Sequence, residues 1–249
     1  MQPTSTSQPR DGVLCRHYLI GTQRPIPFVV LSPANAGDAT PVLLTQHGGG
    51  GHKLAMEVLD LVDRFVLGHG WAVVAMDGPV HGERRQDRRE ERPHVQAEFL
   101  GLWRAGGNHV QEMVADWQAV IDALGSLPEL ERGACHWVGV SMGTAYGLPL
   151  LAVEKRIRAA LVGMWGLSYP RSEVLAQAAP QVTCPVLFQQ KWDDEIFTRD
   201  SQIELFDLIG CPDKRLNVYP GRHVPVKGEQ LDDIVSFILA RHAGGGTPG

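Results

Sequence analysis

No apolar run in the 249-residue chain approaches the roughly 20 residues that are needed to span a bilayer, so we expect no integral membrane protein. Residues 1–10 contain no apolar core of the kind found in secretory signals. The chain also lacks the basic surplus that is typical of nucleic-acid-binding proteins, because its 28 Asp and Glu residues outnumber its 23 Lys and Arg residues. We therefore predict a protein that acts on a small molecule, with no membrane or nucleic-acid partner.

Cysteine is scarce, and its spacing argues against a disulfide framework or a cysteine metal site. The four cysteines lie far apart and form no C-x-x-C pair. Free thiols in a reducing compartment are the simplest interpretation, so we expect a cytoplasmic location. The four residues are Cys15, Cys135, Cys184 and Cys211.

The composition is that of an ordinary globular protein, with 43% apolar and 20% charged residues. The length suits one large domain. Residues 1–11 are rich in Pro, Ser and Thr, and residues 243–249 are rich in Gly, so we expect both ends to be disordered. The prediction is a single domain over residues 12–242.

Short apolar runs alternate with segments of helical periodicity along the domain. Such an alternation predicts an α/β fold with a mostly parallel central sheet of about seven or eight strands and helices on both faces. The chemistry of these folds lies beyond the carboxyl ends of the strands, so the residues that follow each run are candidates for the site. The predicted strands are residues 26–31, 41–45, 71–76, 136–140, 159–164, 185–188 and 216–219.

The segment Gly139–Gly143 has the pattern G-x-S-x-G and lies between a predicted strand and a predicted helix. This is the context of a nucleophile elbow, in which a serine occupies a tight turn and glycines on both sides avoid a collision. The alternative is a plain glycine-rich turn. The predicted strand before the segment and the predicted helix after it favour the elbow over this alternative. Pro149 is expected to kink the following helix or to end it early.

A run of four glycines, 48–51, follows the predicted strand 41–45 and opens into a helix. Backbone N–H groups here are unobstructed and suit a developing oxyanion. A phosphate-binding loop fits poorly, because Lys53 is followed by Leu54 instead of Ser or Thr. His47 and His52 as metal ligands lack a nearby carboxylate or thiol to complete the set.

Three acids and a histidine follow later strands. Asp193, Asp194 and Glu195 come after the strand 185–188, and His223 comes after the strand 216–219. From the residues alone, any of the three acids could orient the histidine. The chain order is serine, acid, histidine, which is the order found in one hydrolase architecture.

Together these motifs resemble the α/β-hydrolase fold over about residues 12–242. The resemblance rests on the HGGG segment 47–50, the GVSMG segment 139–143, the acids 193–195 and the Gly-x-His segment 221–223. The segment 76–84 is also similar to one that commonly follows the fourth strand of the family. The chain looks most like small carboxylesterases and the dienelactone-hydrolase-like group, although dienelactone hydrolases carry cysteine where this chain has Ser141.

The resemblance implies a serine hydrolase that cleaves a small-molecule carboxylic ester through an acyl-enzyme, without a metal or an organic cofactor. Asp194 is favoured as the acid because Phe197 then matches an apolar position of the family, with Asp193 second and Glu195 third. The implied roles are nucleophile for Ser141, base for His223, and oxyanion donors for the N–H groups of Met142 and Gly49, with Gly50 as the alternative to Gly49.

Residues 83–92 form a dense charge run that would place like charges one turn apart in a helix, as in Arg84/Arg88 and Arg85/Arg89. We therefore predict either an irregular excursion or charges that are paired by another part of the molecule or by a partner subunit in a homo-oligomer. Because the run follows a strand end, residues 83–107 are a candidate lid. Trp165 and Trp192 also follow strands and are candidates for contact with the substrate.

The triad pattern does not fix the bond that is cleaved, since specificity depends on the pocket. Alternatives to an ester hydrolase are a thioesterase, a peptidase or a carbon–carbon hydrolase. A non-catalytic binding protein with this fold ranks last, because all three triad residue types are present.

Overall fold

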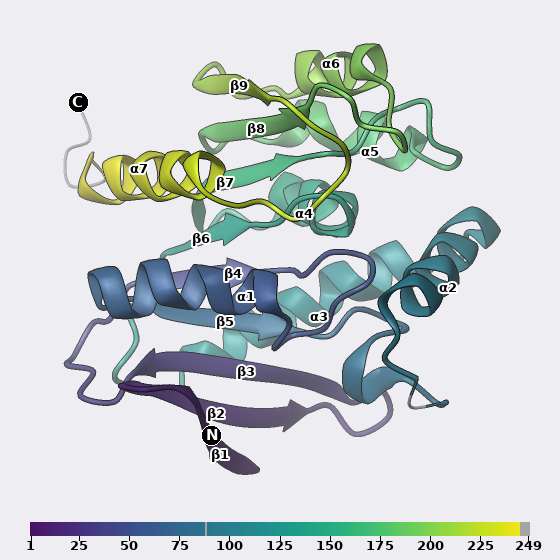
Figure 1. Ribbon diagram of the computed structural model, residues 1–249. Helices are drawn as coiled ribbons and strands as arrows, with labels where there is room; N and C mark the ends of the chain where they lie inside the picture. Colours follow the sequence, from purple (N-terminus) through teal and green to yellow (C-terminus); the bar gives the residue numbers. More distant parts are fainter. Residues whose placement is uncertain (88, 245–249) are drawn as a thin grey trace.

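The computed structural model describes residues 1–87 and 89–244, and all of its named strands belong to one sheet. The strand order is β1-β2-β3-β5-β4-β6-β7-β8-β9 (Figure 1). The first three strands and the β3–β5 pair are antiparallel, and all pairs from β5 to β9 are parallel. The strands are β1 Ser5–Arg10, β2 Val13–Ile20, β3 Ile26–Pro33, β4 Val42–Thr45, β5 Ala72–Met76, β6 Cys135–Val138, β7 Ile157–Gly163, β8 Val186–Lys191 and β9 Lys214–Tyr219.

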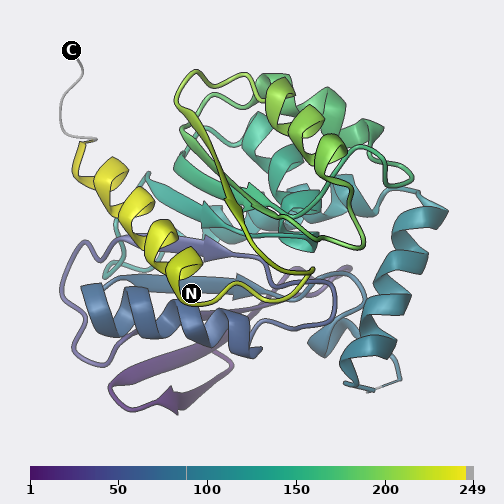
Figure 2. The same ribbon diagram turned by 45° about the horizontal axis from the view of Figure 1, so that its top comes forward.

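Helices cover both faces of the sheet, as predicted. One apolar layer contains α1, the π-helix that extends it, and α7, which lie on the same face in both views (Figures 1 and 2). The other layer contains α2 to α6. The helices are α1 Met56–Leu61, the π-helix Val62–Leu67, α2 Arg92–Ala105, α3 His109–Leu124, α4 Met142–Val153, α5 Glu173–Ala178, α6 Arg199–Leu208 and α7 Glu229–Gly244.

The central strands are buried on both sides. Every residue of β4, β5, β6 and β8 is buried. Burial on both faces is why β5 and the first three residues of β4 and of β8 read as continuous apolar runs in the sequence. The parallel strands all end at one edge of the sheet, where α2 stands in both views (Figures 1 and 2). In the described part of the chain, no helix is both long and apolar enough to cross a membrane.

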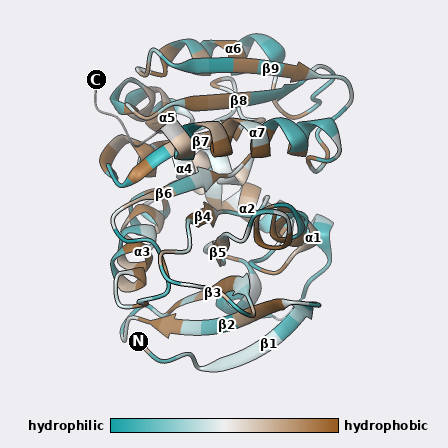
Figure 3. Cartoon of the chain, turned by 90° about the vertical axis from the view of Figure 1, so that its left-hand side faces the viewer, coloured by the Kyte–Doolittle hydropathy of each residue, from teal (hydrophilic) through white to brown (hydrophobic). Residues whose placement is uncertain are grey.

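The prediction that residues 1–11 are disordered is wrong, because Ser5–Arg10 forms β1 and pairs with β2. This edge strand is mostly exposed and polar, and it is drawn pale and teal in Figure 3. The strand is held by backbone hydrogen bonds to β2 and by a 2.9 Å contact between Ser7 Oγ and His17 Nε2, and not by apolar burial. Pro9 is accommodated where the register shifts.

With β1 and β2 the sheet has nine strands, where seven or eight were predicted. At the other end, the predicted tail 243–249 begins too early, since α7 continues to Gly244. The remainder of that tail, residues 245–249, lies outside the described residues.

Pro149 neither ends nor interrupts α4, contrary to the prediction. A proline inside a helix removes one hydrogen bond and costs about 3 kcal/mol or more. Packing outweighs this cost, because α4 is buried on nearly every side and Leu148, Leu150 and Leu151 are at most 2% exposed.

In the charge run 83–92, residues 85–87 and 89–91 are irregular, as the like-charge spacing predicted, while a 3-10 turn covers Gly82–Arg84 and Arg92 begins α2. Two of the described arginines of the run pair with carboxylates of the helices. Arg84 contacts the buried carboxylate of Asp116 at 2.8 Å, and Arg85 contacts Glu98 at 2.8 Å. Arg84 and Arg85 therefore have partners within the same chain.

Candidate active site

Ser141 occupies the turn between β6 and α4 with φ +57° and ψ −117°. This left-handed conformation is strained for a residue with a side chain, and it is characteristic of a nucleophile elbow. The flanking positions must be glycine, because a side chain at either one would collide with neighbouring backbone atoms. A Cβ at Gly139 would lie 2.9 Å from the Cα of Gly143, and a Cβ at Gly143 would lie 2.8 Å from the carbonyl oxygen of Gln46.

Thr144 fixes the elbow to β7, a role that the sequence analysis did not identify. Its hydroxyl lies 2.5 Å from the carbonyl oxygen of Gly163 and accepts the N–H of the same residue at 2.7 Å. The N–H of Ser141 also donates to that carbonyl, at 2.9 Å. The turn that carries Ser141 is therefore attached to the neighbouring strand at several points.

The serine, histidine and aspartate predicted from the sequence form one hydrogen-bonded chain. His223 Nε2 lies 3.0 Å from Ser141 Oγ, and His223 Nδ1 lies 2.9 Å from Asp194 Oδ2. The Asp194 side chain is fully buried, and its other oxygen accepts the N–H groups of Ile196 and Phe197 at 2.9 Å each. Because a carboxylate only accepts, Nδ1 carries the proton and Nε2 is free to accept the Ser141 hydroxyl.

Among the three acids, the side chain of Asp194 meets the imidazole. Asp193 is exposed. Glu195 has a different contact, since its Oε2 accepts the backbone N–H of His223 at 2.9 Å and its Oε1 pairs with Arg222 at 3.2 Å. The hydrogen bond from the His223 backbone lowers the pKa of Glu195. Glu195 thus anchors the loop that presents His223.

The glycine run forms a tight turn at the mouth of the site, in which the N–H of Gly51 donates to the carbonyl oxygen of Gly48 at 2.9 Å. For the described residues, neither Gly49 N–H nor Gly50 N–H has an acceptor within the protein, and both glycines line the cavity that contains Ser141. The N–H of Met142, at the start of α4, is likewise without an acceptor. These three groups are free to bind an oxyanion.

Two buried histidines orient the peptides of this turn. His47 Nδ1 lies 2.8 Å from the carbonyl oxygen of Gly48, and His81 Nε2 lies 2.9 Å from that of Gly49. In a trans peptide the N–H points opposite to the C=O. A hydrogen bond to the carbonyl of Gly48 therefore sets the direction of the Gly49 N–H, and one to the carbonyl of Gly49 sets that of Gly50.

Both histidines are neutral at neutral pH. Burial is the main reason that the pKa of His47 lies well below its ordinary value, with the neighbouring His81 adding to the effect. Burial lowers the pKa of His81 to about 4. The N–H of Gly78 donates to His47 Nε2 at 3.1 Å, which leaves Nδ1 as the nitrogen that donates to Gly48.

Lys53 stabilises this loop, and its ammonium group is not available to bind a phosphate. Its ammonium is buried between Asp77, at 2.5 Å, and Glu83, at 2.6 Å. Asp77 also accepts the backbone N–H groups of Lys53 and Glu83. The segment after β5 thereby holds the loop that leads into α1.

A cavity of about 260 Å³ opens beside the hydrogen-bonded chain of Asp194, His223 and Ser141. Ser141, His223 and Gly48–Gly50 line it, and Arg92 and Gln96 of the predicted lid segment line it as well. The two tryptophans that were predicted to contact the substrate lie elsewhere. Trp165 is fully buried and donates to Ser172 Oγ at 3.0 Å, and the half-exposed Trp192 stacks on Arg199 at 4.1 Å.

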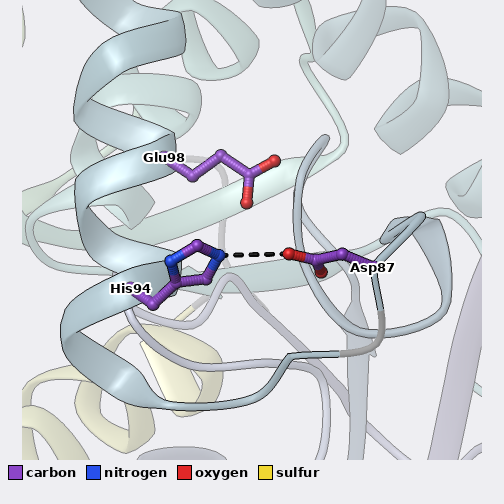
Figure 4. A group of neighbouring side chains, drawn as sticks. All are labelled: Asp87, His94 and Glu98. Atoms are coloured by element: carbon purple, nitrogen blue, oxygen red, sulfur yellow. Dashed lines mark hydrogen bonds and ion pairs between the residues drawn. The ribbon is translucent and has the colours of Figure 1, made fainter.

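The described residues contain one cluster with the composition of a metal site, Asp87, His94 and Glu98 (Figure 4). His94 Nε2 and Asp87 are 3.1 Å apart, and the buried guanidinium of Arg85 already pairs with both carboxylates, at 2.6 and 2.8 Å. His94 and Glu98 each come two residues after a cavity-lining residue of α2, so they face away from Ser141. The cluster is separate from the hydrogen-bonded chain that contains Ser141.

The model of the alpha/beta hydrolase family matches residues 42–234, which is most of the chain. The chain belongs to the α/β-hydrolase family. This confirms the fold and the family resemblance that the motifs predicted. No curated protein sequence matches the chain.

Solved structures extend the comparison. The chain is 33% identical to a PEG-bound cold-adapted esterase from an Arctic intertidal metagenomic library, with a TM-score of 0.80, over 97% of this chain and 99% of that one. It shares 16% identity and a TM-score of 0.70 with a putative dienelactone hydrolase from Klebsiella pneumoniae, over 93% of this chain and 98% of that one. It shares 15% identity and a TM-score of 0.66 with Est1E from Butyrivibrio proteoclasticus, over 91% and 99%. The last two show the fold alone.

Proposed function

We propose that this protein is a serine hydrolase that cleaves small-molecule carboxylic esters through an acyl-enzyme. The observation that carries the proposal is the continuous relay from Asp194 through His223 to Ser141, with contacts of 2.9 and 3.0 Å. The relay lies beside unpaired backbone N–H groups in one cavity. Such a combination of nucleophile, base and oxyanion donors suits acyl transfer.

In the acylation step, the oxygen of Ser141 attacks the ester carbon while His223 Nε2 takes the hydroxyl proton. The new imidazolium is stabilised by the buried carboxylate of Asp194, which also keeps the ring in the required tautomer. When the tetrahedral intermediate collapses, the bond to the alcohol oxygen breaks. That oxygen takes the proton from His223 and leaves as the alcohol.

The charge that develops on the carbonyl oxygen is met by N–H groups. We assign this role to Met142 and Gly49, with Gly50 beside them, because their N–H groups have no acceptor in the described protein and their orientation is fixed by the elbow and by the two histidines. Preorganised donors of this kind contribute about 10²- to 10³-fold each to the rate.

Deacylation repeats the same proton transfers with water. His223 takes a proton from the water as its oxygen attacks the acyl carbon, and the Ser141 oxygen leaves and recovers the proton from His223. No step of this cycle calls for a metal or an organic cofactor.

The choice of an oxygen ester over the other bonds rests on the relatives. The esterase structures from the Arctic library are 30–33% identical to the chain over 95–97% of its length. Thioester, amide and carbon–carbon cleavage remain the alternative reactions of the same triad. Rates on a matched oxygen ester, thioester and anilide with one acyl group separate them, and the proposal requires the oxygen ester to be preferred over the anilide and the thioester in kcat/KM.

The primary test compares hydrolysis of p-nitrophenyl acetate by the native protein and by Ser141→Ala. We expect the substitution to abolish activity, with a loss on the order of 10⁶-fold for a triad serine, and to leave the fold intact. Ser236→Ala, an exposed serine on α7, is the matched control and should retain native activity. Residual activity of Ser141→Ala close to the native rate would rule out the assigned nucleophile.

We also propose a reducing, cytoplasmic location. All four cysteines are free, and Cys15, Cys135 and Cys211 are buried. Burial raises the pKa of each of these thiols, which keeps them in the unreactive protonated form. Thiol titration of the freshly purified native protein under denaturing conditions should find four free thiols, whereas fewer would contradict this proposal.

A further inference from the structure

The segment that carries His223 contains no helix or strand. Residues 220–228 connect β9 to α7, and in Figure 1 they pass the carboxyl end of the sheet before they turn back into α7. The start of this segment is attached to the loop after β8, because the N–H of Asp193 donates to the carbonyl oxygen of Gly221 at 3.0 Å. The part of the segment that precedes His223 is therefore fixed.

The part that follows His223 has fewer attachments. The backbone hydrogen bonds of residues 224–228 reach no farther than Arg222 and the first turn of α7. Residues 224–226 line the cavity beside Ser141. Along the described chain beyond His223, Gln230 is the first residue whose hydrogen bonds reach the sheet. The position of this part of the segment therefore depends on Gln230.

Gln230 is buried and is held at two points by the face of β8 that packs against α7. Gln189 Nε2 donates to the backbone carbonyl oxygen of Gln230 at 2.9 Å, and the ammonium of Lys191 donates to its side-chain oxygen. Gln189 and Lys191 are two residues apart on one strand, so their side chains share a face. Together they attach the first turn of α7 to the strand that leads to Asp194.

Lys191 is the unusual member of this contact. The residue is only 7% exposed, and it forms no ion pair with a carboxylate of the described chain. Burial lowers the pKa of its ammonium. An ammonium loses its hydration on burial, so an apolar side chain of similar size would be less costly at this position. A buried charge with a single partner instead specifies which group must lie beside it, and here that group is Gln230.

We propose that Lys191 is a positioning residue of the hydrolase, and that its bond to Gln230 sets how far the His223 segment reaches toward Ser141. This inference rests on the proposed ester hydrolase function. The proton moves across the 3.0 Å contact between His223 and Ser141, and a misplacement of about 1 Å can cost roughly a hundredfold in rate. Lys191 does not line the cavity, so it acts on the rate through the position of the imidazole.

Lys191→Met keeps a long side chain and removes its donors. We expect kcat for p-nitrophenyl acetate to fall about tenfold or more with KM within about threefold of the native value, because a displaced imidazole slows proton transfer. The rate of labelling by a fluorophosphonate should fall by a similar factor, since that reaction also needs His223 to take the proton of Ser141. Gln230→Leu removes the acceptor and should have the same effects.

A double variant tests whether the two residues act together. Lys191→Met/Gln230→Leu should stay within about twofold of the slower single variant, because each substitution already breaks the same contact. Gln230→Glu keeps an acceptor for the ammonium and should retain kcat within about threefold of the native value.

Lys214→Met is the matched control for the loss of a lysine from the sheet. Lys214 lies at the start of β9, and its ammonium donates to three carbonyl oxygens near the end of α6 at 2.8 to 3.0 Å. This substitution should lower the melting temperature and leave kcat unchanged. Thermal melting of every variant verifies folding, and Gln230→Leu carries the test if Lys191→Met does not fold.

The outcomes separate this inference from the function on which it rests. If the native protein cleaves no ester in a Ser141-dependent manner, the proposed function itself fails. If esters are cleaved but the folded Lys191→Met and Gln230→Leu variants keep the native kcat and labelling rate, Lys191 has only a structural role and the hydrolase stands. If the losses of the two single variants multiply in the double variant, Lys191 does not act through Gln230, and the inference is equally wrong.

Discussion

His81 donates a hydrogen bond from Nε2 to the carbonyl oxygen of Gly49, at 2.9 Å and across 32 residues of sequence. The ring is fully buried and lies in edge contact with that of His47. Because this bond fixes the peptide between Gly49 and Gly50, it connects the segment after β5 to the N–H groups that we propose as oxyanion donors. His81 is therefore a positioning residue in our account of the site.

Replacing His81 should impair the transition state more than substrate binding. We expect His81→Leu to lower kcat by roughly ten- to a hundredfold with little change in KM, because a misdirected N–H group loses part of the oxyanion stabilisation. His81→Gln retains a donor at a similar reach and should recover much of kcat. The exposed His69→Leu is the matched control. Equal losses in the Gln and Leu variants would argue against the role.

The stability of the protein should depend on pH through the same residue. Burial lowers the pKa of His81 from 6.5 to about 4, although the nearby carboxylates of Asp77 and Glu98 oppose the shift and Arg85 adds to it. Between these values the unfolded chain binds a proton that the folded protein does not. The free energy of unfolding should therefore increase as the pH rises from 4 to 6.5.

Denaturant unfolding at several pH values measures this dependence. In the His81→Gln variant the slope should be shallower by up to about 1.4 kcal/mol per pH unit, since one titrating group is removed. His47 contributes in the same direction in both proteins. A variant whose slope equals that of the native protein would show that His81 titrates normally.

The acid of the relay can be identified by a pair of isosteric substitutions. Asp194→Asn should lower kcat by about 10⁴-fold, because the amide favours the wrong tautomer of His223. Asp193→Asn, in the adjacent exposed position, should stay within about twofold of the native rate. Steady-state kinetics on p-nitrophenyl acetate decides the assignment, and the reverse pattern would transfer the role to Asp193.

Gly49 should not tolerate a side chain. A Cβ at this position would lie 2.7 Å from the Phe99 ring of α2. We expect Gly49→Ala to shift the oxyanion turn and to lower kcat about tenfold or more. The double variant Gly49→Ala/Phe99→Leu makes room and should recover part of that loss, measured against Phe99→Leu alone. Independent, additive effects of the two substitutions would exclude this collision as the cause.

Features that depend on local pattern were predicted from the sequence. The buried central strands appeared as continuous apolar runs, and the elbow appeared as G-x-S-x-G between a strand and a helix. The position of each motif just after a strand was enough to bring Ser141 and His223 to the same edge of a parallel sheet. The irregular course of residues 85–87 and 89–91 followed from the like-charge spacing of the run.

Features that depend on tertiary contacts were not predicted. The edge strand β1 has no run of apolar residues that would mark it as a strand in the sequence. Backbone hydrogen bonds to β2 hold it instead. Thr144, His81 and Glu195 act through hydrogen bonds to backbone groups that are distant in sequence, which no local pattern reports. Trp165 follows a strand but points into the core, where Trp103 and Phe197 pack against it.

The central claim is that Ser141 is the nucleophile that forms the acyl-enzyme. A fluorophosphonate probe that reacts only with an activated serine tests it most directly, with the modified peptide located by mass spectrometry. We predict one adduct, on the peptide that contains Ser141, with no labelling of the folded Asp194→Asn or Ser141→Ala proteins on the same timescale. Ester hydrolysis by the native protein with the adduct on a different residue, or with Ser141 unmodified, would contradict the account.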